Sequence, residues 1–178
     1  MTTEALKKKK PNDQPAPVKK PGTKPAPVAK PGGATAKTKA VVELSEHIVE
    51  VVSDSGEGAQ RCGQSLAAIA ARMGNGIWTV EIIPAEIQPP ARSIAGGSGN
   101  RVRMATGRVT NGGDEADLIV AFNEQVLLGR VHVHELKPGC IILLESKWRT
   151  DGDPEIEAAY TQTYSELVDS GYVVHEIP

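Results

Sequence analysis

The segment Ser53–Gly58 has the residue types and spacing of a ligand-binding turn. It joins residues 47–52, which alternate like a buried strand, to residues 59–73, whose apolar positions recur at helical spacing. Gly56 and Gly58 tolerate positive φ and allow a ligand to approach the backbone closely. The unpaired amides at the start of the helix attract anions. The segment is therefore a candidate phosphate-binding loop.

The same segment matches no complete nucleotide-binding motif. A Walker loop requires Lys-Ser or Lys-Thr after its last glycine, and Ala59 follows here. The dinucleotide motif G-x-G-x-x-G requires a third glycine where Arg61 stands. A tight turn at the start of an ordinary β-α unit also explains these residues, and the motif alone favours that interpretation.

No catalytic or metal-binding set is predicted from the remaining reactive side chains. No base can be placed beside Ser53 or Ser55, and the G-x-S-x-G nucleophile motif is absent. The two cysteines form no C-x-x-C pair, so we expect no zinc or iron–sulfur site, and both are predicted to be small buried side chains. They are Cys62, on the predicted helix, and Cys140, at the start of an apolar strand. His132 and His134 have no third ligand nearby, which argues against a metal site.

Charge divides the 178 residues into two segments. Residues 1–40 hold ten Lys, no Arg and two acids, a net charge of +8, whereas residues 41–178 hold ten basic and twenty acidic residues, a net charge of −10. The first segment contains an imperfect Pro-Ala-Pro-Val repeat and no large apolar run, which predicts a disordered tail. A flexible tether is the favoured interpretation and docking onto an acidic partner the alternative. Nucleic-acid binding is not favoured, because no Arg or aromatic residue is interleaved.

Residues 41–178 are predicted to form one α/β domain: an open Rossmann-like sheet, mostly parallel or mixed, flanked by helices. The elements expected are strands at 47–52, 77–83, 100–105, 116–122, 140–144 and 172–177, and helices at 59–73, 123–133 and 154–169. Residues 136–139 are expected to be a turn and residues 146–148 a loop. With no secretory signal and no apolar run long enough for a bilayer, the sequence predicts a soluble cytoplasmic protein.

A second candidate binding segment covers residues 84–93, where three prolines prevent regular structure. It carries a carboxylate, Glu86, an amide, Gln88, and a guanidinium, Arg92. A glycine-rich turn follows it. A binding surface and a plain surface excursion are equally consistent with this composition.

Several ordered motifs resemble the γ-type domain of 2-oxoacid:ferredoxin oxidoreductases, in the version fused to the front of the α subunit of 2-oxoglutarate:ferredoxin oxidoreductases. The resemblance covers roughly residues 45–178. The motifs lie at residues 53–58, 74–75, 84–87, 95–99, 116–123 and 136–142. Ser53 and Arg92 replace glycines common in the family, and Gln88 replaces an arginine. These departures leave open which 2-oxoacid is used and which ligand contacts remain.

The resemblance implies a complex that decarboxylates a 2-oxoacid, such as 2-oxoglutarate or pyruvate, on thiamine diphosphate. Such a complex forms acyl-coenzyme A and reduces ferredoxin through iron–sulfur clusters. The γ-type domain shapes the active-site region, while thiamine-binding partner subunits hold the cofactors. This chain would then be inactive alone, bind no cofactor alone, and need no membrane or nucleic acid.

The resemblance also assigns supporting roles to five residues. Ser55, Gly56 and Gly58 would shape the backbone or contact an anion. Glu86 and Arg92 would face the cofactor or coenzyme A region, with an interfacial salt bridge as an equal alternative for Glu86.

Two other functions stay open at this point. The chain could be a free-standing nucleotide- or anion-binding module, or a structural assembly domain tethered by its tail. Because it stops where the family's domain would pass into an α-subunit linker, a separate subunit and a fragment of a longer protein are both expected possibilities.

Overall fold

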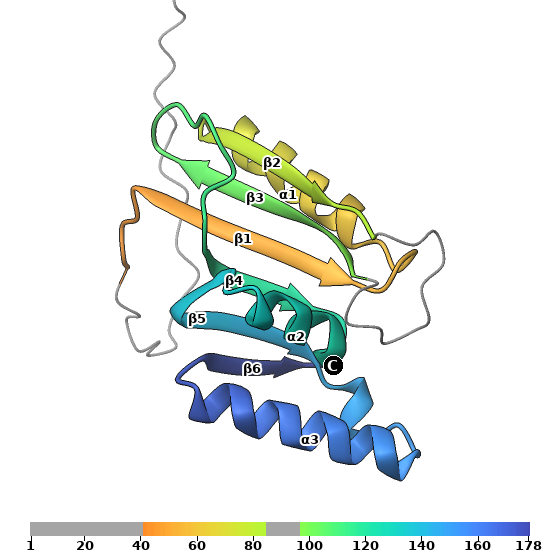
Figure 1. Cartoon of the computed structure of the whole chain (residues 1–178). Coiled ribbons are helices and arrows are strands. Elements are labelled where there is room, and N and C mark those ends of the chain that lie inside the picture. Colours follow the sequence, from red (N-terminus) through yellow and green to blue (C-terminus); the bar gives the residue numbers. More distant parts are fainter. Residues whose placement is uncertain (1–40, 85–96) are drawn as a thin grey trace, which may run out of the picture. The chain divides into compact units, whose positions relative to one another are not determined.

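The structure, a computed structural model, describes residues 41–84 and 97–178 (Figure 1). Residues 1–40 and the segment containing Glu86, Gln88 and Arg92 lie outside the described residues, so the predictions made for them stay predictions. The elements in chain order are β1 (Glu46–Ser53), α1 (Ala59–Arg72), β2 (Gly76–Ile82), β3 (Ser98–Ala105), β4 (Ala116–Ala121), α2 (Glu124–His132), β5 (Leu136–Glu145), the 3₁₀ helix η2 (Lys147–Thr150), α3 (Pro154–Asp169) and β6 (Val173–Ile177).

All the described strands form one six-stranded sheet in the order β2-β3-β1-β4-β5-β6. The neighbouring pairs from β1 to β6 are parallel, whereas β3 runs antiparallel to both β1 and β2. The predicted fold class, a mixed α/β sheet flanked by helices, is confirmed.

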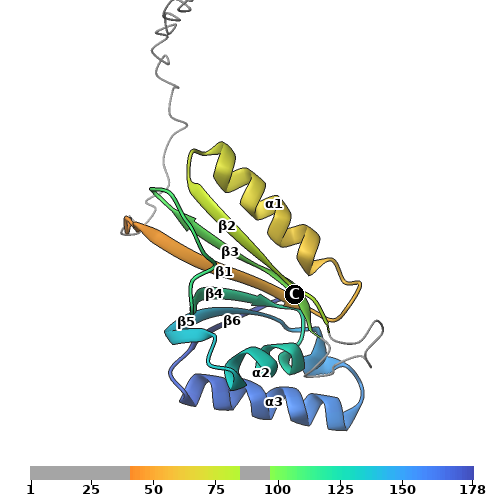
Figure 2. The same ribbon diagram turned by 45° about the horizontal axis from the view of Figure 1, so that its top comes forward.

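The chain winds in two directions from the centre of the sheet. From β1 it passes through α1 to the β2 edge, and from β4 it passes through α2 and α3 toward β6. Right-handed crossovers in opposite directions place helices on opposite faces. Figures 1 and 2 show α1 on one face and α2 with α3 on the other. The winding therefore reverses between β1 and β4, which is where open α/β sheets bind ligands, at the carboxyl ends of the strands.

The main apolar core lies between the sheet and the helices α2 and α3. Its buried residues are Val52, Ile119, Ala121, Leu127, Leu136, Cys140, Ile142, Leu144, Tyr160 and Leu167. The alternation of β4 and β5 directs every second side chain into this layer. The prediction that Cys140 is buried is confirmed, and this burial raises the pKa of its thiol to about 12.

Helix α1 packs on the sheet through small residues. Of the apolar positions that recur at helical spacing, Cys62, Leu66, Ile69, Ala70 and Met73, Ala70 alone is fully buried. The buried residues of the helix are Ala59, Gly63, Ala67 and Ala70. A Cβ atom on Gly63 would lie 2.4 Å from the Cβ of Asn100, so the helix approaches β3 too closely for larger side chains. The larger apolar residues turn outward instead: Ile69, Met73 and Cys62 are exposed, and the prediction of a buried Cys62 is wrong.

Two other differences concern β5 and its end. The strand starts at Leu136, not Cys140, because the predicted turn is a bulge inside it: Ala116 pairs with Leu136, but Leu118 pairs with Ile141. Gly139, with φ of 75°, lies in this bulge. The loop expected at residues 146–148 opens the 3₁₀ helix η2.

Four charged side chains form a network on the α2 face of the sheet. The carboxylate of Glu50, in the central strand, is fully buried and accepts hydrogen bonds from Arg101 Nε at 2.6 Å and Arg130 Nε at 3.0 Å. Both arginines also pair with Glu135. Arg101 Nη1 donates to the carbonyl of Gly113 at 2.7 Å. The network joins β1, β3, α2 and the 106–115 loop.

Candidate active-site edge

Two loops meet at the carboxyl edge of the sheet where the winding reverses. The amide of Phe122 donates to the carbonyl of Val52 at 3.0 Å, and Asn123 Nδ2 donates to Asp54 Oδ2 at 3.1 Å. The other amide atom of the buried Asn123, Oδ1, accepts from the backbone N–H of Val126 at 2.9 Å and so caps α2. One side chain thus holds the loop after β1 to the start of α2.

The glycines of the first loop are required by its backbone conformation. Gly56 and Gly58 have φ of 93° and 96°, values that side chains with a Cβ rarely adopt. A Cβ on either would meet no atom within 4 Å, so crowding is not the reason. Gly58 is the N-cap of α1, without a side-chain cap, and no acidic residue occupies the first turn. The N-terminal end of α1 is therefore open to an anion.

A pocket of about 310 Å³, here called the α1 pocket, lies at this helix end. It is lined by Gly56, Gly58, Ala59, Gln60, Arg61, Gln64 and Ser98. Two amides are oriented by β2: Gln64 Nε2 donates to Glu81 Oε1 at 3.2 Å, and Gln60 Nε2 reaches the carbonyl of Ile82 at 3.4 Å. Among the lining residues that the structure describes, one is cationic and none is a carboxylate. This composition suits a phosphate or carboxylate ligand.

On the β4–β5 side of the same loop, acidic groups gather. Glu57 Oε2 accepts from the backbone N–H of Asp54 at 3.0 Å. Burial raises the pKa of Glu57 above its usual value, and the neighbouring carboxylates of Asp54 and Glu145 add to the rise; the Asp54 N–H and Lys147 oppose it. Two regions of different charge therefore lie on the two sides of the loop.

The 3₁₀ helix η2 borders this acidic region. Trp148 Nε1 donates to the carbonyl of Phe122 at 2.9 Å, and the ammonium group of Lys147 lies 4.8 Å from the centre of the Trp148 ring. The backbone N–H of Lys147 donates to Glu145 Oε1 at 3.1 Å. These contacts fix the residues that follow β5 against those that follow β4.

The predicted site residues are only partly brought together. Gly56 and Gly58 line the α1 pocket, and Ser55 is exposed in the same loop but is not among the lining residues. Glu86 and Arg92 lie outside the described residues. The structure adds Gln60, Arg61, Gln64 and Ser98, which sequence reasoning missed. The helix start predicted at Ala59 could have pointed to the first three, and the 95–99 motif contained Ser98.

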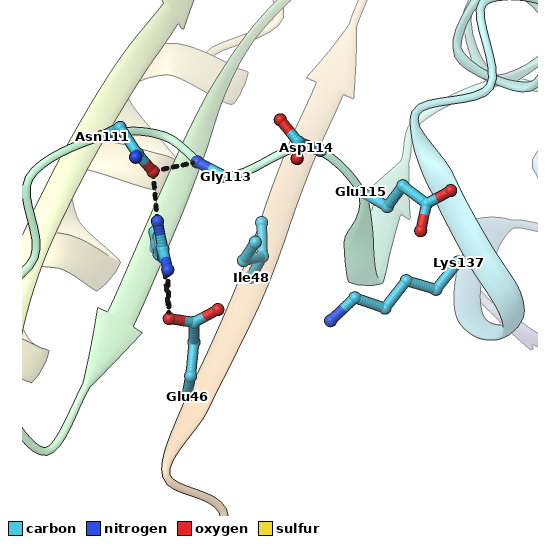
Figure 3. Close-up of a pocket in the computed structure, with 8 residues that line it drawn as sticks. Glu46, Ile48, Asn111, Gly113, Asp114, Glu115 and Lys137 are labelled. Atoms are coloured by element: carbon cyan, nitrogen blue, oxygen red, sulfur yellow. Dashed lines mark hydrogen bonds and ion pairs between the residues drawn. The ribbon is translucent and has the colours of Figure 1, made fainter.

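A second pocket, of about 370 Å³, lies at the amino end of β1 and β4 (Figure 3). It is lined by Glu46, Ile48, Arg103, Asn111, Gly113, Asp114, Glu115 and Lys137. Its two cations are already held by carboxylates: Arg103 Nε donates to Glu46 Oε2 at 2.9 Å, and Lys137 Nζ lies 2.7 Å from Asp117 Oδ1. Burial would raise the pKa of Asp117, but hydrogen bonds from Lys137 and the Ile48 N–H lower it below its usual value. We assign this pocket a structural role.

Within residues 41–84 and 97–178, no group of three or more His, Cys, Asp or Glu side chains is arranged to hold a metal ion. Among the helices of that same part of the chain, none combines the length and hydropathy needed to cross a bilayer.

No family model matches the chain, but comparison with known proteins found similar chains. The chain is 28% identical over 134 residues to 2-oxoglutarate oxidoreductase subunit KorA of Mycobacterium tuberculosis. The alignment covers 75% of this chain and 20% of KorA, so the chain spans about a fifth of the length of this curated relative.

Two solved structures of 2-oxoacid:ferredoxin oxidoreductases are also similar to this chain. A 2-oxoglutarate:ferredoxin oxidoreductase from Magnetococcus marinus, solved with 2-oxoglutarate, coenzyme A and succinyl-CoA bound, is 26% identical with a TM-score of 0.53. That match covers 76% of this chain and 20% of the other. The γ subunit of a keto/oxoacid ferredoxin oxidoreductase from Geobacter sulfurreducens is 16% identical with a TM-score of 0.45, over 70% of this chain and 75% of the subunit.

Proposed function

We propose that this chain, a relative of the 2-oxoacid:ferredoxin oxidoreductase subunits, is the γ-type domain or subunit of such an enzyme. The complex would decarboxylate a 2-oxoacid, with 2-oxoglutarate or pyruvate as the candidates, form acyl-coenzyme A and reduce ferredoxin. In this proposal the chain shapes the active-site region and the assembly, and it is inactive alone.

One observation carries the proposal: similarity to KorA extends over three quarters of this chain yet over only a fifth of KorA. A segment of that size does not account for the activity of the whole relative. We therefore place the thiamine diphosphate and iron–sulfur sites on partner subunits. The candidate site of the described residues offers anion contacts, which suits a supporting role in ligand binding.

For the α1 pocket we propose contact with a phosphate group of coenzyme A. The N-terminal end of α1, the open backbone at Gly56 and Gly58, and the Arg61 guanidinium would together bind a dianion. The volume of about 310 Å³ accommodates one or two phosphate groups and not the whole cofactor. The rest of the ligand would lie against other chains.

The proposal is tested by purifying the full chain, tagged, together with its native partners. We expect a thiamine-containing partner to co-purify, and the complex to reduce viologen only when a 2-oxoacid and coenzyme A are present. A monomer that binds nucleotide without such partners would contradict the proposal and favour the free-standing anion-binding module. A partner without thiamine would favour a structural assembly domain.

A further inference from the structure

One face of the parallel half of the sheet is not covered by any described helix. Helices α2 and α3 cover one face of β4, β5 and β6, but α1, on the other face, contacts β3, β2 and β1. Parallel sheets occur almost only with both faces covered, because their strands are apolar on both sides. Within residues 41–84 and 97–178, the face of β4–β5–β6 on the α1 side therefore lacks a covering helix.

The exposed fractions along one row of paired residues show how far α1 covers this face of the sheet. Val102, Val49, Leu118, Ile141 and Val173 are partners across five neighbouring strands and share the α1 face. Val102 is 0% exposed and Val49 4%, whereas Ile141 is 38% and Val173 46% exposed. Exposure rises with distance from α1. The next row repeats the pattern, from the buried Val51 through Val120 and Leu143 to an exposed histidine in β6.

Helix α1 turns an apolar side toward this open face. Gln60 and Gln64 extend toward β2, so the opposite side of the helix faces β4. That side carries the larger apolar residues that α1 does not bury against its own sheet, namely Cys62, Leu66, Ile69 and Met73. Together with the open face, it makes a continuous apolar surface bordered by α1 and based on β4–β5–β6, here called the α1–β6 groove.

The dimensions of the α1–β6 groove match one helix. Three strands spaced by about 4.8 Å give a floor roughly 10 Å wide between the axes of β4 and β6, similar to the diameter of a helix with its side chains. The five residues of β5 paired with β6 correspond to about three helical turns. A helix here would lie beside α1, where a doubly wound sheet ordinarily has its next helix.

Charges at the two ends of the groove give that helix a direction. At the carboxyl edge, the three carboxylates of Asp54, Glu57 and Glu145 outnumber the one ammonium group of Lys147. At the other end, Arg72 occupies the last turn of α1, a helix with no acidic residue. Because a helix is partly positive at its N-terminus and partly negative at its C-terminus, these ends favour a helix parallel to α1.

We propose that the α1–β6 groove receives one amphipathic helix of a partner protein, with its N-terminus at the Glu57 edge and its C-terminus near Arg72. The partner helix would carry Leu, Ile or Val at helical spacing toward the groove, basic residues in its first turn and acidic residues in its last. This inference involves no substrate or cofactor, so its test is independent of the proposed reaction.

The test uses two stapled peptides of about 15 residues with the same leucine stripe and the same composition. Peptide A has Lys in its first turn and Glu in its last, and peptide B has these charges exchanged. Binding to the full chain is read from the reaction of the exposed Cys62 thiol with a disulfide reagent, while the buried Cys140 reports any unfolding. We expect peptide A to slow the reaction of Cys62 about ten-fold. Peptide B should need about ten-fold higher concentrations to give the same protection, since the charges at both of its ends are reversed.

Matched variants locate the binding site. Ile141→Ser and Val173→Ser, on the floor, should weaken binding of peptide A at least several-fold, because each removes apolar contact area. Val80→Ser is the control, since Val80 is 41% exposed but shares the opposite face with Arg101. All three side chains are partly exposed, so their loss leaves the core intact.

Two results would overturn the proposal. Equal protection of Cys62 by both peptides, or by neither, would exclude a helix site with this direction. A dimer in sedimentation equilibrium that Ile141→Ser dissociates would assign the groove to a second copy of the chain.

Discussion

At the scale of single residues, Arg61 is the side chain on which the proposed ligand contact depends most. It is the one cation among the described residues that line the α1 pocket. We expect Arg61→Gln to raise the KM for coenzyme A in the purified complex about ten-fold while leaving kcat within about two-fold, since a charged hydrogen bond contributes about 1.5–3 kcal/mol. Arg72→Gln, in the last turn of the same helix, is the matched control. Equal effects of the two variants would remove the α1 pocket from coenzyme A binding.

Glu50 is expected to be the most sensitive charged residue of the fold. It is fully buried between Arg101 and Arg130, so Glu50→Gln leaves two guanidinium groups without their central carboxylate. Breaking such a buried pair costs about 3–5 kcal/mol of unfolding free energy. Glu46→Gln, at the exposed end of the same strand, should cost no more than about 1 kcal/mol. Urea denaturation of both variants measures the difference, and similar losses would contradict this account of the network.

Glu57 and Asp117 should give opposite pH dependences. The folded-state pKa of Glu57 is raised, so its contribution to stability is present below its unfolded pKa and is lost as pH rises through the folded value. The folded-state pKa of Asp117 is lowered, so its contribution is present above its unfolded pKa and is lost as pH falls through the folded value.

The measurement is thermal unfolding of Glu57→Gln and Asp117→Asn at several pH values. Relative to the parent chain, Glu57→Gln should gain stability as pH rises from the acidic range to neutral. Asp117→Asn should lose stability over the same change. Parallel pH profiles of the two variants would show that the local environments have been misread.

At the scale of elements, the small residues under α1 are the feature that sequence reasoning missed. The apolar positions that predict this helix are Cys62, Leu66, Ile69, Ala70 and Met73. Of these, Ala70 is buried, whereas Cys62, Ile69 and Met73 are exposed. The helix approaches β3 so closely that only glycine and alanine fit. A stripe of small residues resembles a surface in hydropathy, so the sequence alone does not distinguish it. For the same reason, the sequence alone did not predict the exposed apolar side of α1 that borders the α1–β6 groove.

Gly63→Ala tests this close approach. Alanine is the better helix former by about 1 kcal/mol, so an open site would be stabilised. Here the new Cβ would lie 2.4 Å from the Cβ of Asn100, and we expect a net loss of about 1–3 kcal/mol in urea denaturation. Ser65→Ala, on the exposed side of α1, is the control and should change stability by less than about 0.5 kcal/mol. A stabilised Gly63→Ala would show that α1 lies further from the sheet.

The strands were predicted more closely than the helix faces. Period-two alternation and continuous apolar runs placed all six of them, because burial in a sheet repeats with the pleat. Arg101 and Arg103 face the same side of the sheet, since they pair with Glu50 and Ile48 in β1. The carboxylate partners of Arg101 could not be predicted, since Glu50 and Glu135 come from strands and turns distant in the chain. Pro-Gly is typical of both turns and bulges, so the sequence predicts a turn at Gly139 where the structure has a bulge.

At the scale of the whole molecule, the resemblance predicted from ordered motifs agrees with the similarity to 2-oxoglutarate oxidoreductase subunit KorA, whereas the candidate site is only partly described. Motif order constrains a fold at several points along the chain, so agreement at six places is informative even where each motif is weak. Ligand contacts depend on single side chains, and Glu86 and Arg92 stay predictions because they lie outside the described residues.

The tail prediction also belongs to this scale. Residues 1–40 are rich in lysine and proline and have no large apolar run, so they have little apolar surface to bury. We expect their deletion to change the free energy of unfolding of the remaining chain by less than about 0.5 kcal/mol in urea denaturation. Substitution of all ten lysines by glutamine keeps the length of this segment and removes its positive charge, so it separates the effect of charge on stability from the effect of length. A large loss of stability on deletion would contradict the predicted disorder.

The contact between Asn123 and Asp54 has a consequence for how such variants combine. The same amide that caps α2 holds the loop after β1, so the two windings of the chain share one hydrogen-bonded side chain. Substitutions in the two loops are then thermodynamically coupled, and their effects on unfolding should not add. A double-mutant cycle between Asp54→Ala and Asn123→Ala would express this as an interaction energy. Because of this coupling, a ligand bound at the loop after β1 would change the stability of the N-terminal end of α2.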